Sequence, residues 1–234
     1  MNTEAEIMKT GVIIPALNEE AGIEAVLSKT KQYIPAERIC VIDDGSGDRT
    51  AALAESAGVH CICFTENRGK GEALKTGFSW AIEQRLDAVI TLDADGQHDP
   101  DLIPEFIQTM QITRCDVVLG TRRFKLGEMP PDRIFSNTVS SFLVSIAAKH
   151  RIADSQSGYR MFRMSVLKNL KLRGRLYELE SEMLIRLGRK HVSFATCSIP
   201  ASYTGAASSI RRWRDIRRFA GMWFSLLFER KDTT

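Results

Sequence analysis

The sequence has no apolar run long enough to cross a membrane. A transmembrane helix needs roughly 18–20 consecutive apolar residues, whereas the apolar stretch Phe219–Phe228 covers only ten. The first nine residues also lack the apolar segment of a signal peptide. The composition, with 44% hydrophobic and 26% charged residues, is typical of a globular protein. We therefore expect a cytoplasmic protein that is not integral to a membrane.

Cysteine is scarce and shows no metal-binding spacing. The five cysteines include Cys61 and Cys63, which are too close for the usual ligand pair of a zinc finger. Three of the five lie in apolar, strand-like runs, so we expect buried free thiols in a reducing compartment. No Ser/His/Asp or Cys/His arrangement is apparent either. The sequence thus indicates neither a zinc finger nor a nucleophilic triad.

The glycine-rich loops that usually bind nucleotides are also missing. Residues 67–71, Asn-Arg-Gly-Lys-Gly, lack the Walker pattern because Gly71 stands where Ser or Thr should follow Lys70. No Gly-x-Gly-x-x-Gly pattern follows a predicted strand. Nucleotide binding of the Walker or dinucleotide type is therefore disfavoured. Lys70, near the start of a predicted helix, could still face a diphosphate or a base, or it could be a solvated lysine.

Charge of one sign does not dominate the chain. The net charge of +3 argues against a general nucleic-acid-binding protein. Positive charge is nevertheless concentrated near the C-terminus, in Arg211, Arg212, Arg214, Arg217 and Arg218. Ser208 to about Glu229 also reads as an amphipathic helix, and such a basic helix attracts phosphate or anionic lipid. Ordinary core packing is the alternative for this helix and for the apolar positions of 134–147.

Strands and helices are expected to alternate through the first half of the chain. The predicted strands cover 11–14, 38–42, 60–64, 88–92 and 116–119, with helical patterns between them. This order predicts an α/β fold with a mainly parallel sheet flanked by helices. Further on we expect helices at 134–147 and 178–190 and strands near 160–162 and 191–199. We divide the chain into a flexible N-terminus (1–9), one domain (10–205) and a basic helical segment (206–234).

The most informative polar cluster follows the predicted strand Ala88–Leu92. Asp93 and Asp95 lie at its carboxyl end, and Gly96 allows the backbone to turn. Ligands of open α/β sheets bind at the carboxyl ends of strands. Asp-x-Asp followed by Gln97 offers hard oxygen ligands for Mg²⁺ or Mn²⁺ on a diphosphate. A simple turn cap is the alternative.

A second acidic pair, Asp43-Asp44, follows the strand 38–42. A carboxylate at this position can accept hydrogen bonds from a uracil or guanine edge or from a ribose. Ser46 and Asp48 are explained by an Asx turn and helix capping. Because the carboxyl ends of parallel strands share one edge, one cleft could collect these acids and the Asn18-Glu19-Glu20 turn.

Four segments in order resemble the family-2 glycosyltransferases of the GT-A fold. They are Val12–Glu20 (Val-Ile-Ile-Pro-Ala-Leu-Asn-Glu-Glu), Val41–Thr50 (Val-Ile-Asp-Asp-Gly-Ser-Gly-Asp-Arg-Thr), Asn67–Ala73 and Leu92–Pro100 (Leu-Asp-Ala-Asp-Gly-Gln-His-Asp-Pro). Gly120-Thr121-Arg122 and Asp154-x-x-Ser-Gly-Tyr-Arg-Met-Phe162 resemble the dolichyl-phosphate mannose synthase and polyprenyl-phosphate glycosyltransferase branch. The resemblance covers roughly residues 10–200. It implies inverting transfer of a sugar from a GDP- or UDP-sugar to a polyprenyl or dolichyl phosphate, with a divalent metal.

The resemblance also implies roles for individual residues. The nucleoside and sugar would be held by Pro15, Leu17, Glu19, Ile42, Asp44, Asp93 and Ala94, with Lys70 near the diphosphate. Asp95 and Gln97 would hold Mg²⁺ or Mn²⁺, and Asp93, Asp95 and Arg122 form the catalytic set. The acceptor phosphate would meet Arg122, Arg133, Arg160, Arg211 and Arg212. A phosphate acceptor is already anionic and needs no general base. We expect the enzyme to bind the membrane surface peripherally and to bind no nucleic acid.

One departure and three alternatives remain. Where mannose synthases carry Arg and a Gly-Glu-Ser-Lys-like segment, this chain has residues 200–211 without the lysine, which weakens an assignment of mannose or GDP. A hydroxyl acceptor would need a base, for which Asp154 or Glu182 is the best candidate. A haloacid-dehalogenase-like phosphatase also uses Asp-x-Asp, but Gln97 stands where that signature requires Thr or Val. A non-catalytic nucleotide-sugar-binding or scaffold protein is the third alternative.

Overall fold

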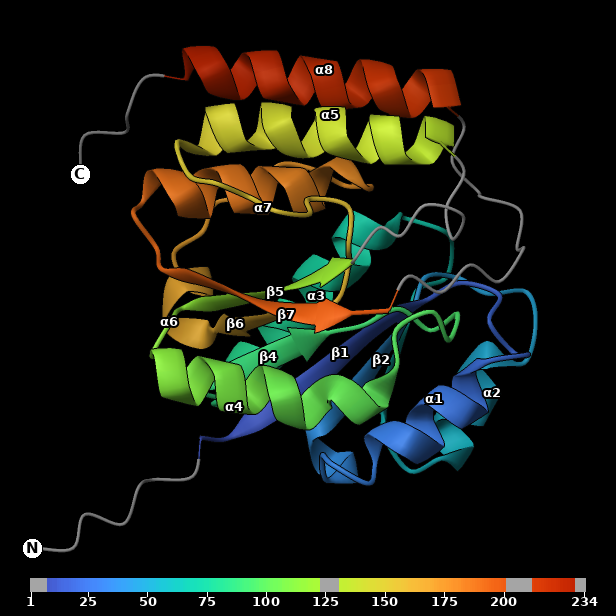
Figure 1. The fold of residues 1–234 in the computed structure, drawn as a ribbon. Coiled ribbons are helices and arrows are strands. Elements are labelled where there is room, and N and C mark those ends of the chain that lie inside the picture. Colours follow the sequence, from blue (N-terminus) through green and yellow to red (C-terminus); the bar gives the residue numbers. More distant parts are fainter. Residues whose placement is uncertain (1–7, 123–130, 201–211, 230–234) are drawn as a thin grey trace, which may run out of the picture.

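The computed structural model describes residues 8–122, 131–200 and 212–229, and the side chains of 131–133 and 212–216 lie outside this description. A seven-stranded sheet with the order β3-β2-β1-β4-β6-β5-β7 forms the centre (Figure 1). Its strands are β1 (Thr10–Ala16), β2 (Ile39–Asp43), β3 (His60–Cys63), β4 (Ala88–Thr91), β5 (Val117–Arg122), β6 (Arg160–Arg163) and β7 (Phe194–Ile199). All neighbouring strands are parallel except β6, which is antiparallel to β4 and β5. The predicted α/β fold is confirmed.

Helices cover both faces of the sheet (Figure 1). On one face, α1 (Ile23–Thr30), α2 (Thr50–Ser56) and α4 (Ile103–Thr113) bury apolar side chains against alternate positions such as Val12 and Ile14. On the other face, Ile13 and Phe162 contact a second cluster. That face carries α3 (Lys70–Glu83), α5 (Pro131–Ala148), α6 (Met164–Leu167), α7 (Glu178–Arg189) and α8 (Arg212–Phe228). Two short 3-10 turns, η1 (Ala36–Arg38) and η2 (Pro100–Leu102), complete the described elements.

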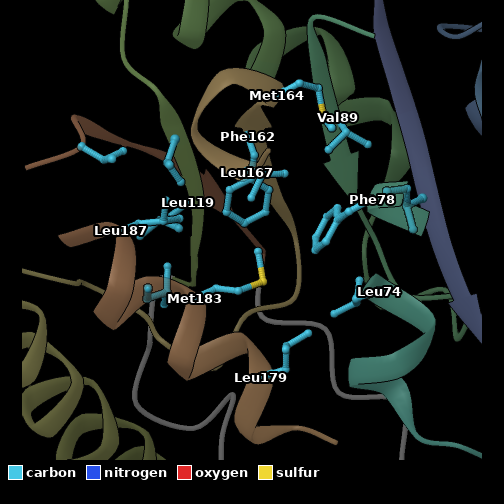
Figure 2. Packing of buried hydrophobic residues seen from close by; sticks show 14 of the residues in the cluster. Leu74, Phe78, Val89, Leu119, Phe162, Met164, Leu167, Leu179, Met183 and Leu187 are labelled. Carbon is cyan, nitrogen blue, oxygen red and sulfur yellow. The ribbon is translucent and has the colours of Figure 1, made fainter. Parts of the chain in front are cut away.

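The second cluster joins the sheet to α3 and α7. Figure 2 shows Phe162 from β6 between Phe78 of α3 and Met183 of α7. The rings of Phe78 and Phe162 meet edge to face with centroids 6.1 Å apart. Such aromatic contacts bury large apolar areas and hold their elements in one arrangement. The core therefore fixes the positions of α3 and α7 relative to the central strands. These two helices supply polar side chains to the candidate active site.

The helix α8 lies outermost, beside α5 and above α7 (Figure 1). The indole N–H of Trp223 donates to the carbonyl of Leu143 at 2.8 Å, and Arg189 of α7 donates to the carbonyls of Ala147 and Leu226. Leu143 of α5 is bonded to Trp223 of α8, and further along both helices Ala147 and Leu226 are both bonded to Arg189. The helices α5 and α8 therefore run in the same direction. The predicted C-terminal helix is thus attached to the domain through hydrogen bonds and through the buried Leu226.

Most element boundaries agree with the sequence prediction to within three residues. The helix predicted over 134–147 begins at Pro131, because proline is well accommodated in a first helical turn. The strand predicted from 191 begins only at Phe194. Residues 190 and 191 still bond back to the last turn of α7, and His191 has a positive φ of 56°.

Candidate active site

The site lies where the strand order reverses direction. The chain adds β2 and β3 on one side of β1 and then returns to place β4 on the other side. At such a switch point the loops after neighbouring strands separate and leave a crevice for a ligand. Glu19 follows β1, Asp44 follows β2 and Asp93 follows β4. The fold therefore brings three of the sequence-predicted acids to the same edge of the sheet.

Asp93 forms a short ion pair with Lys70. The Lys70 Nζ lies 2.6 Å from Asp93 Oδ1, and both side chains are largely buried. Burial alone would raise the pKa of Asp93, but the nearby Lys70 ammonium outweighs it and holds this pKa at about 2. Burial would likewise lower the pKa of Lys70, and the Asp93 and Glu180 carboxylates raise it above its usual range. Both groups are therefore charged at neutral pH.

His98 binds the backbone of Asp93. The backbone N–H of Asp93 donates to His98 Nδ1 at 2.9 Å, so this nitrogen is an acceptor and carries no proton. Burial lowers the pKa of His98, which agrees with a neutral imidazole. The contact of 3.7 Å between His98 and the Asp93 carboxylate is consequently not an ion pair at neutral pH. The His98 ring lies against Tyr159, which stacks on Phe106.

Asp95 and Gln97, the predicted metal ligands, lie at the open end of this loop. Asp95 is exposed, and its Oδ1 accepts a hydrogen bond from the Gln97 backbone N–H at 2.9 Å. Burial and the charges of Asp95 and Asp93 raise the pKa of Glu19 to about 7. The carboxylates of Glu19, Asp93 and Asp95 therefore share one site, and their mutual repulsion makes negative charge there unfavourable. Such a site fits a divalent cation.

The described residues contain no group of three or more His, Cys, Asp or Glu side chains with metal-binding geometry. A divalent ion at Asp95 and Gln97 would need further oxygen ligands from water or from a diphosphate. Mg²⁺ in phosphoryl-binding sites is commonly held in this way, with one or two carboxylates and substrate phosphates. The donor set fits an ion that is bound together with its substrate.

The predicted nucleoside-binding residues have different degrees of access. Pro15 and Ile42 are buried within β1 and β2, and Ala94 is buried after β4. Leu17 is 37% exposed beside Glu19. The Asp44 carboxylate accepts hydrogen bonds from the backbone N–H groups of Arg68 and Gly69 at 2.7 and 2.9 Å. Asp44 thus holds the start of α3, and a nucleoside would have to share oxygens that already accept bonds.

The loops after β1 and β2 hold each other in place. Asn18 donates its backbone N–H to Ser46 Oγ, and its side-chain oxygen accepts from the Gly47 N–H, both at 2.8 Å. The Glu19 N–H donates to Thr50 Oγ1 at 2.8 Å. Asp48 accepts hydrogen bonds from the backbone N–H and the hydroxyl of Thr50 at the start of α2, as the Asx-turn interpretation predicted. These contacts fix the backbone around Glu19 in advance of any ligand.

Arg122, at the end of β5, is held by Asp154. The guanidinium donates from Nε and Nη2 to the two Asp154 oxygens at 2.8 and 2.9 Å. Burial would raise the pKa of Asp154, but its bonds to Arg122 and to the Gln156 N–H lower it overall. A carboxylate with a lowered pKa and two occupied oxygens is a poor general base. Asp154 is thus a partner of Arg122, not a free base.

Arg160 is buried, in contrast to the partly exposed Arg122. Its side chain is only 2% exposed. Its guanidinium donates to the backbone carbonyls of Ser155 and Glu180 at 2.8 and 3.0 Å. The hypothesis that Arg160 contacts the acceptor phosphate therefore needs correction: the side chain is buried beneath the site because the protein's own carbonyls bind it. The side chains of Arg133 and Arg212, and the whole of Arg211, lie outside the described residues.

Glu182, the second proposed base, is also engaged in the protein interior. Its Oε2 accepts from the Gly174 N–H at 2.7 Å, and its Oε1 pairs with Arg186 at 2.7 Å. The side chain is 3% exposed. This position corrects the expectation that Glu182 could act as a base, because a buried carboxylate with these partners anchors the loop before α7.

Sequence reasoning missed Glu180, two residues earlier on the same helix. Its Oε2 lies 3.4 Å from Lys70 Nζ. Glu178, Glu180 and Glu182 are spaced evenly along the sequence, and no local pattern distinguishes the one that faces Lys70. The close packing of Gly158 was missed as well: a Cβ there would lie 3.1 Å from both Asp93 Oδ2 and Lys70 Nζ.

Comparison with known proteins shows the family of this chain. Residues 11–171 match the model described as glycosyl transferase family 2, and the chain belongs to this family. A UDP-N-acetylglucosamine–dolichyl-phosphate N-acetylglucosaminyltransferase of Methanococcus voltae is 33% identical over 217 residues, covering 82% of this chain and 85% of that protein. An undecaprenyl-phosphate mannosyltransferase of Micrococcus luteus is 29% identical over 193 residues, covering 78% and 79%.

The fold is also found in a solved glycosyltransferase. Glucosyl-3-phosphoglycerate synthase of Mycobacterium tuberculosis, solved with Mn²⁺, UDP-glucose and phosphoglyceric acid, aligns with a TM-score of 0.75 at 20% identity. The alignment covers 96% of this chain and 81% of that one. At this identity the likeness shows the fold alone. The resemblance drawn from the sequence motifs is confirmed, the protein is an enzyme of the glycosyltransferase class, and the phosphatase and scaffold alternatives are wrong.

Proposed function

We propose that this enzyme transfers a sugar, with inversion, from a UDP- or GDP-sugar to a polyprenyl or dolichyl phosphate at a membrane surface. The observation that carries the proposal is the state of the two candidate bases. Asp154 is paired with Arg122, and Glu182 is buried against Arg186 and backbone N–H groups. A hydroxyl acceptor needs a base to remove its proton. A phosphate acceptor brings its own negative charge and needs only charge neutralisation and alignment.

The donor would lie along the edge formed by Glu19, Asp93 and Asp95. A divalent cation, when bound to Asp95 and Gln97, would neutralise the diphosphate that leaves with the nucleoside. Asp93 would orient the ribose and the sugar, because Lys70 keeps its carboxylate ionised and His98 holds its backbone N–H. Arg122 would face the acceptor or donor phosphate. Asp154 already holds the Arg122 side chain in one orientation, so binding a phosphate costs little further side-chain entropy.

The acceptor's lipid chain requires a surface that lies against the membrane. Along α5, Phe135, Val139, Phe142 and Ile146 form a single stripe, and Phe135 and Phe142 are 72% and 63% exposed. The neighbouring α8 adds exposed Phe224 and Phe228. Arg217 and Arg218 are exposed on the same helix. Aromatic side chains beside arginines are typical of helices that lie in the membrane interface. No helix in the described part of the chain is long and apolar enough to cross a bilayer.

The function can be tested with three acceptors in parallel. Purified enzyme with Mn²⁺ and a panel of UDP- and GDP-sugars is given a polyprenyl phosphate, the matching polyprenol or 3-phosphoglycerate, and products are identified by mass spectrometry. We expect glycolipid from the polyprenyl phosphate only. Product from the polyprenol would favour a hydroxyl acceptor and contradict the proposed chemistry, and product from phosphoglycerate alone would contradict the lipid acceptor.

Membrane binding is tested by replacing two exposed rings. The double variant Phe135→Ser and Phe142→Ser should lower the affinity for anionic vesicles about a hundredfold or more, since each of the two buried rings contributes on the order of 1.5–3 kcal/mol. The control is Ile112→Ser on α4, which is 73% exposed on the opposite face of the sheet. Equal vesicle sedimentation of the double variant, the control and the wild type would contradict this part of the proposal.

A further inference from the structure

Glu180 approaches the site from outside the segment that defines the family. The family model ends at residue 171, and Glu180 lies in the first turn of α7. Its side chain is 14% exposed, and its Oε2 lies 3.4 Å from Lys70 Nζ. The same Nζ lies 2.6 Å from Asp93 on its other side. Lys70 is therefore held between one acid from β4 and one from α7.

The position of Glu180 is itself fixed by Arg160. The buried guanidinium donates to the Glu180 backbone carbonyl at 3.0 Å, and its Nη1 lies 4.0 Å from Glu180 Oε1. Positive and negative groups thus alternate from Asp93 through Lys70 and Glu180 to Arg160. In a buried cluster of this kind, removal of one member leaves an uncompensated charge, so its effect extends to its neighbours.

The backbone closes the remaining side of the cluster. Gly158 lies so near that a Cβ would contact both Lys70 Nζ and Asp93 Oδ2 at 3.1 Å. The Gly158 carbonyl accepts a hydrogen bond from Thr91 Oγ1 at 2.8 Å, which ties this backbone to the end of β4. Lysine has a long, flexible side chain and loses entropy when it is held in one position. The two carboxylates and the Gly158 backbone together confine it.

We propose that Glu180 is a positioning residue that holds the Lys70 ammonium against Asp93 and so sets the affinity for the nucleotide donor. The inference rests on the proposed function, in which Asp93, held by Lys70, contacts the donor. Glu180 acts through Lys70 and touches no substrate itself. A purely structural acid would instead stabilise the start of α7 through the helix dipole. That role would alter stability without a specific effect on Lys70.

The first test measures how firmly Lys70 is held, through the reactivity of its amine. Folded wild type, Glu180→Gln and Glu178→Gln are treated with acetic anhydride, and acetylation at Lys70 is followed by mass spectrometry. Glu178 is the matched control, because it lies in the same turn and its carboxylate accepts from the Arg175 and Leu176 backbone N–H groups. We expect Glu180→Gln to raise the Lys70 rate about fivefold, the ratio for a lost coupling of about 1 kcal/mol, and Glu178→Gln to leave it unchanged. Equal rates in both variants would overturn the inference.

The second test asks whether this position matters for the donor. UDP and GDP are titrated in the presence of Mn²⁺ into wild type, Glu180→Gln, Lys70→Met and the double variant. Glu180→Gln should weaken nucleotide binding about tenfold when Lys70 is present and much less when it is Met, because coupled residues are not additive. Equal weakening in both backgrounds would overturn the inference. If wild type binds neither nucleotide, both the proposed function and the role of Lys70 at the donor site are wrong. The acetylation rates would still decide whether Glu180 holds Lys70.

Discussion

Glu19 provides the sharpest test of the electrostatics of the site. Burial and the charges of Asp95 and Asp93 raise its pKa from an ordinary value of 4.5 to about 7. Folded protein therefore binds more protons than unfolded protein between these two values, and stability falls as the pH rises through that window. The destabilisation is absent below about pH 4.5 and complete above about pH 7.

The magnitude follows from the size of the shift. A shift of one pKa unit corresponds to about 1.4 kcal/mol, so ionisation of Glu19 destabilises the folded protein by at most roughly 3 kcal/mol. Because Glu19 is partly exposed, solvent screening reduces the expected effect to about 1–2 kcal/mol. Glu19→Gln removes the charge and should raise the melting temperature by roughly 2–8 °C at about pH 8. Near pH 4.5 the same substitution should have little effect.

The assay is thermal unfolding of wild type, Glu19→Gln and a control, each without added metal at both pH values. Glu24→Gln is a suitable control because Glu24 is an exposed acid on the neighbouring helix α1. Addition of Mn²⁺ at the higher pH should stabilise the wild type more than Glu19→Gln, because a cation favours the ionised carboxyl. A Glu19→Gln effect that is the same at both pH values would refute the reasoning.

Three further predictions concern neighbouring parts of the site. Asp154→Asn should lower kcat/KM about tenfold to a hundredfold and the free energy of unfolding by about 3–5 kcal/mol, because it leaves Arg122 without its paired charge; activity unchanged within twofold would contradict this. Asp95→Ala should abolish the stimulation by Mn²⁺ while the melting temperature without metal stays within about 2 °C, since Asp95 is exposed; retained stimulation would remove Asp95 from the metal site. Gly69→Ala should destabilise the protein by more than about 2 kcal/mol in denaturant unfolding, because Gly69 has a φ of 98° and lies against residues 175 and 176. Gly58→Ala, with a φ of 73° and open space around it, should cost only about 1 kcal/mol, and equal losses would contradict the packing argument.

Three acids of the sequence-based site share one feature in the structure. Asp154 and Glu182 were considered as bases for a hydroxyl acceptor and Asp44 as a nucleoside-binding residue, yet each accepts hydrogen bonds from groups of the protein itself. Those partners are supplied by other elements or loops: Asp154 and Arg122 are 32 residues apart, and Asp44 and Arg68 are 24 apart. A carboxylate binds whichever donor the fold places next to it. Sequence patterns identify acids at strand ends but do not identify these donors.

The sequence by itself determined the local features and the class of fold. Alternating apolar segments specified the strands and helices, and four short motifs specified the family. Turn chemistry was local as well, since Asp48 accepts from the Thr50 N–H and Asp95 from the Gln97 N–H, each two residues further on. These interactions join residues so close in the chain that backbone geometry alone brings them together.

Only the tertiary structure decided which distant groups meet. It inserted β6 antiparallel between β4 and β5, which carries Gly158 and Arg160 to the side of Asp93. It also selected Glu180 from three glutamates in one stretch of α7 as the partner of Lys70. Strand order and the packing of α7 against the sheet depend on the whole apolar core, not on the residues near Glu180. The charged cluster around Asp93 is therefore a property of the fold, because its members are joined through space and no local sequence pattern specifies them.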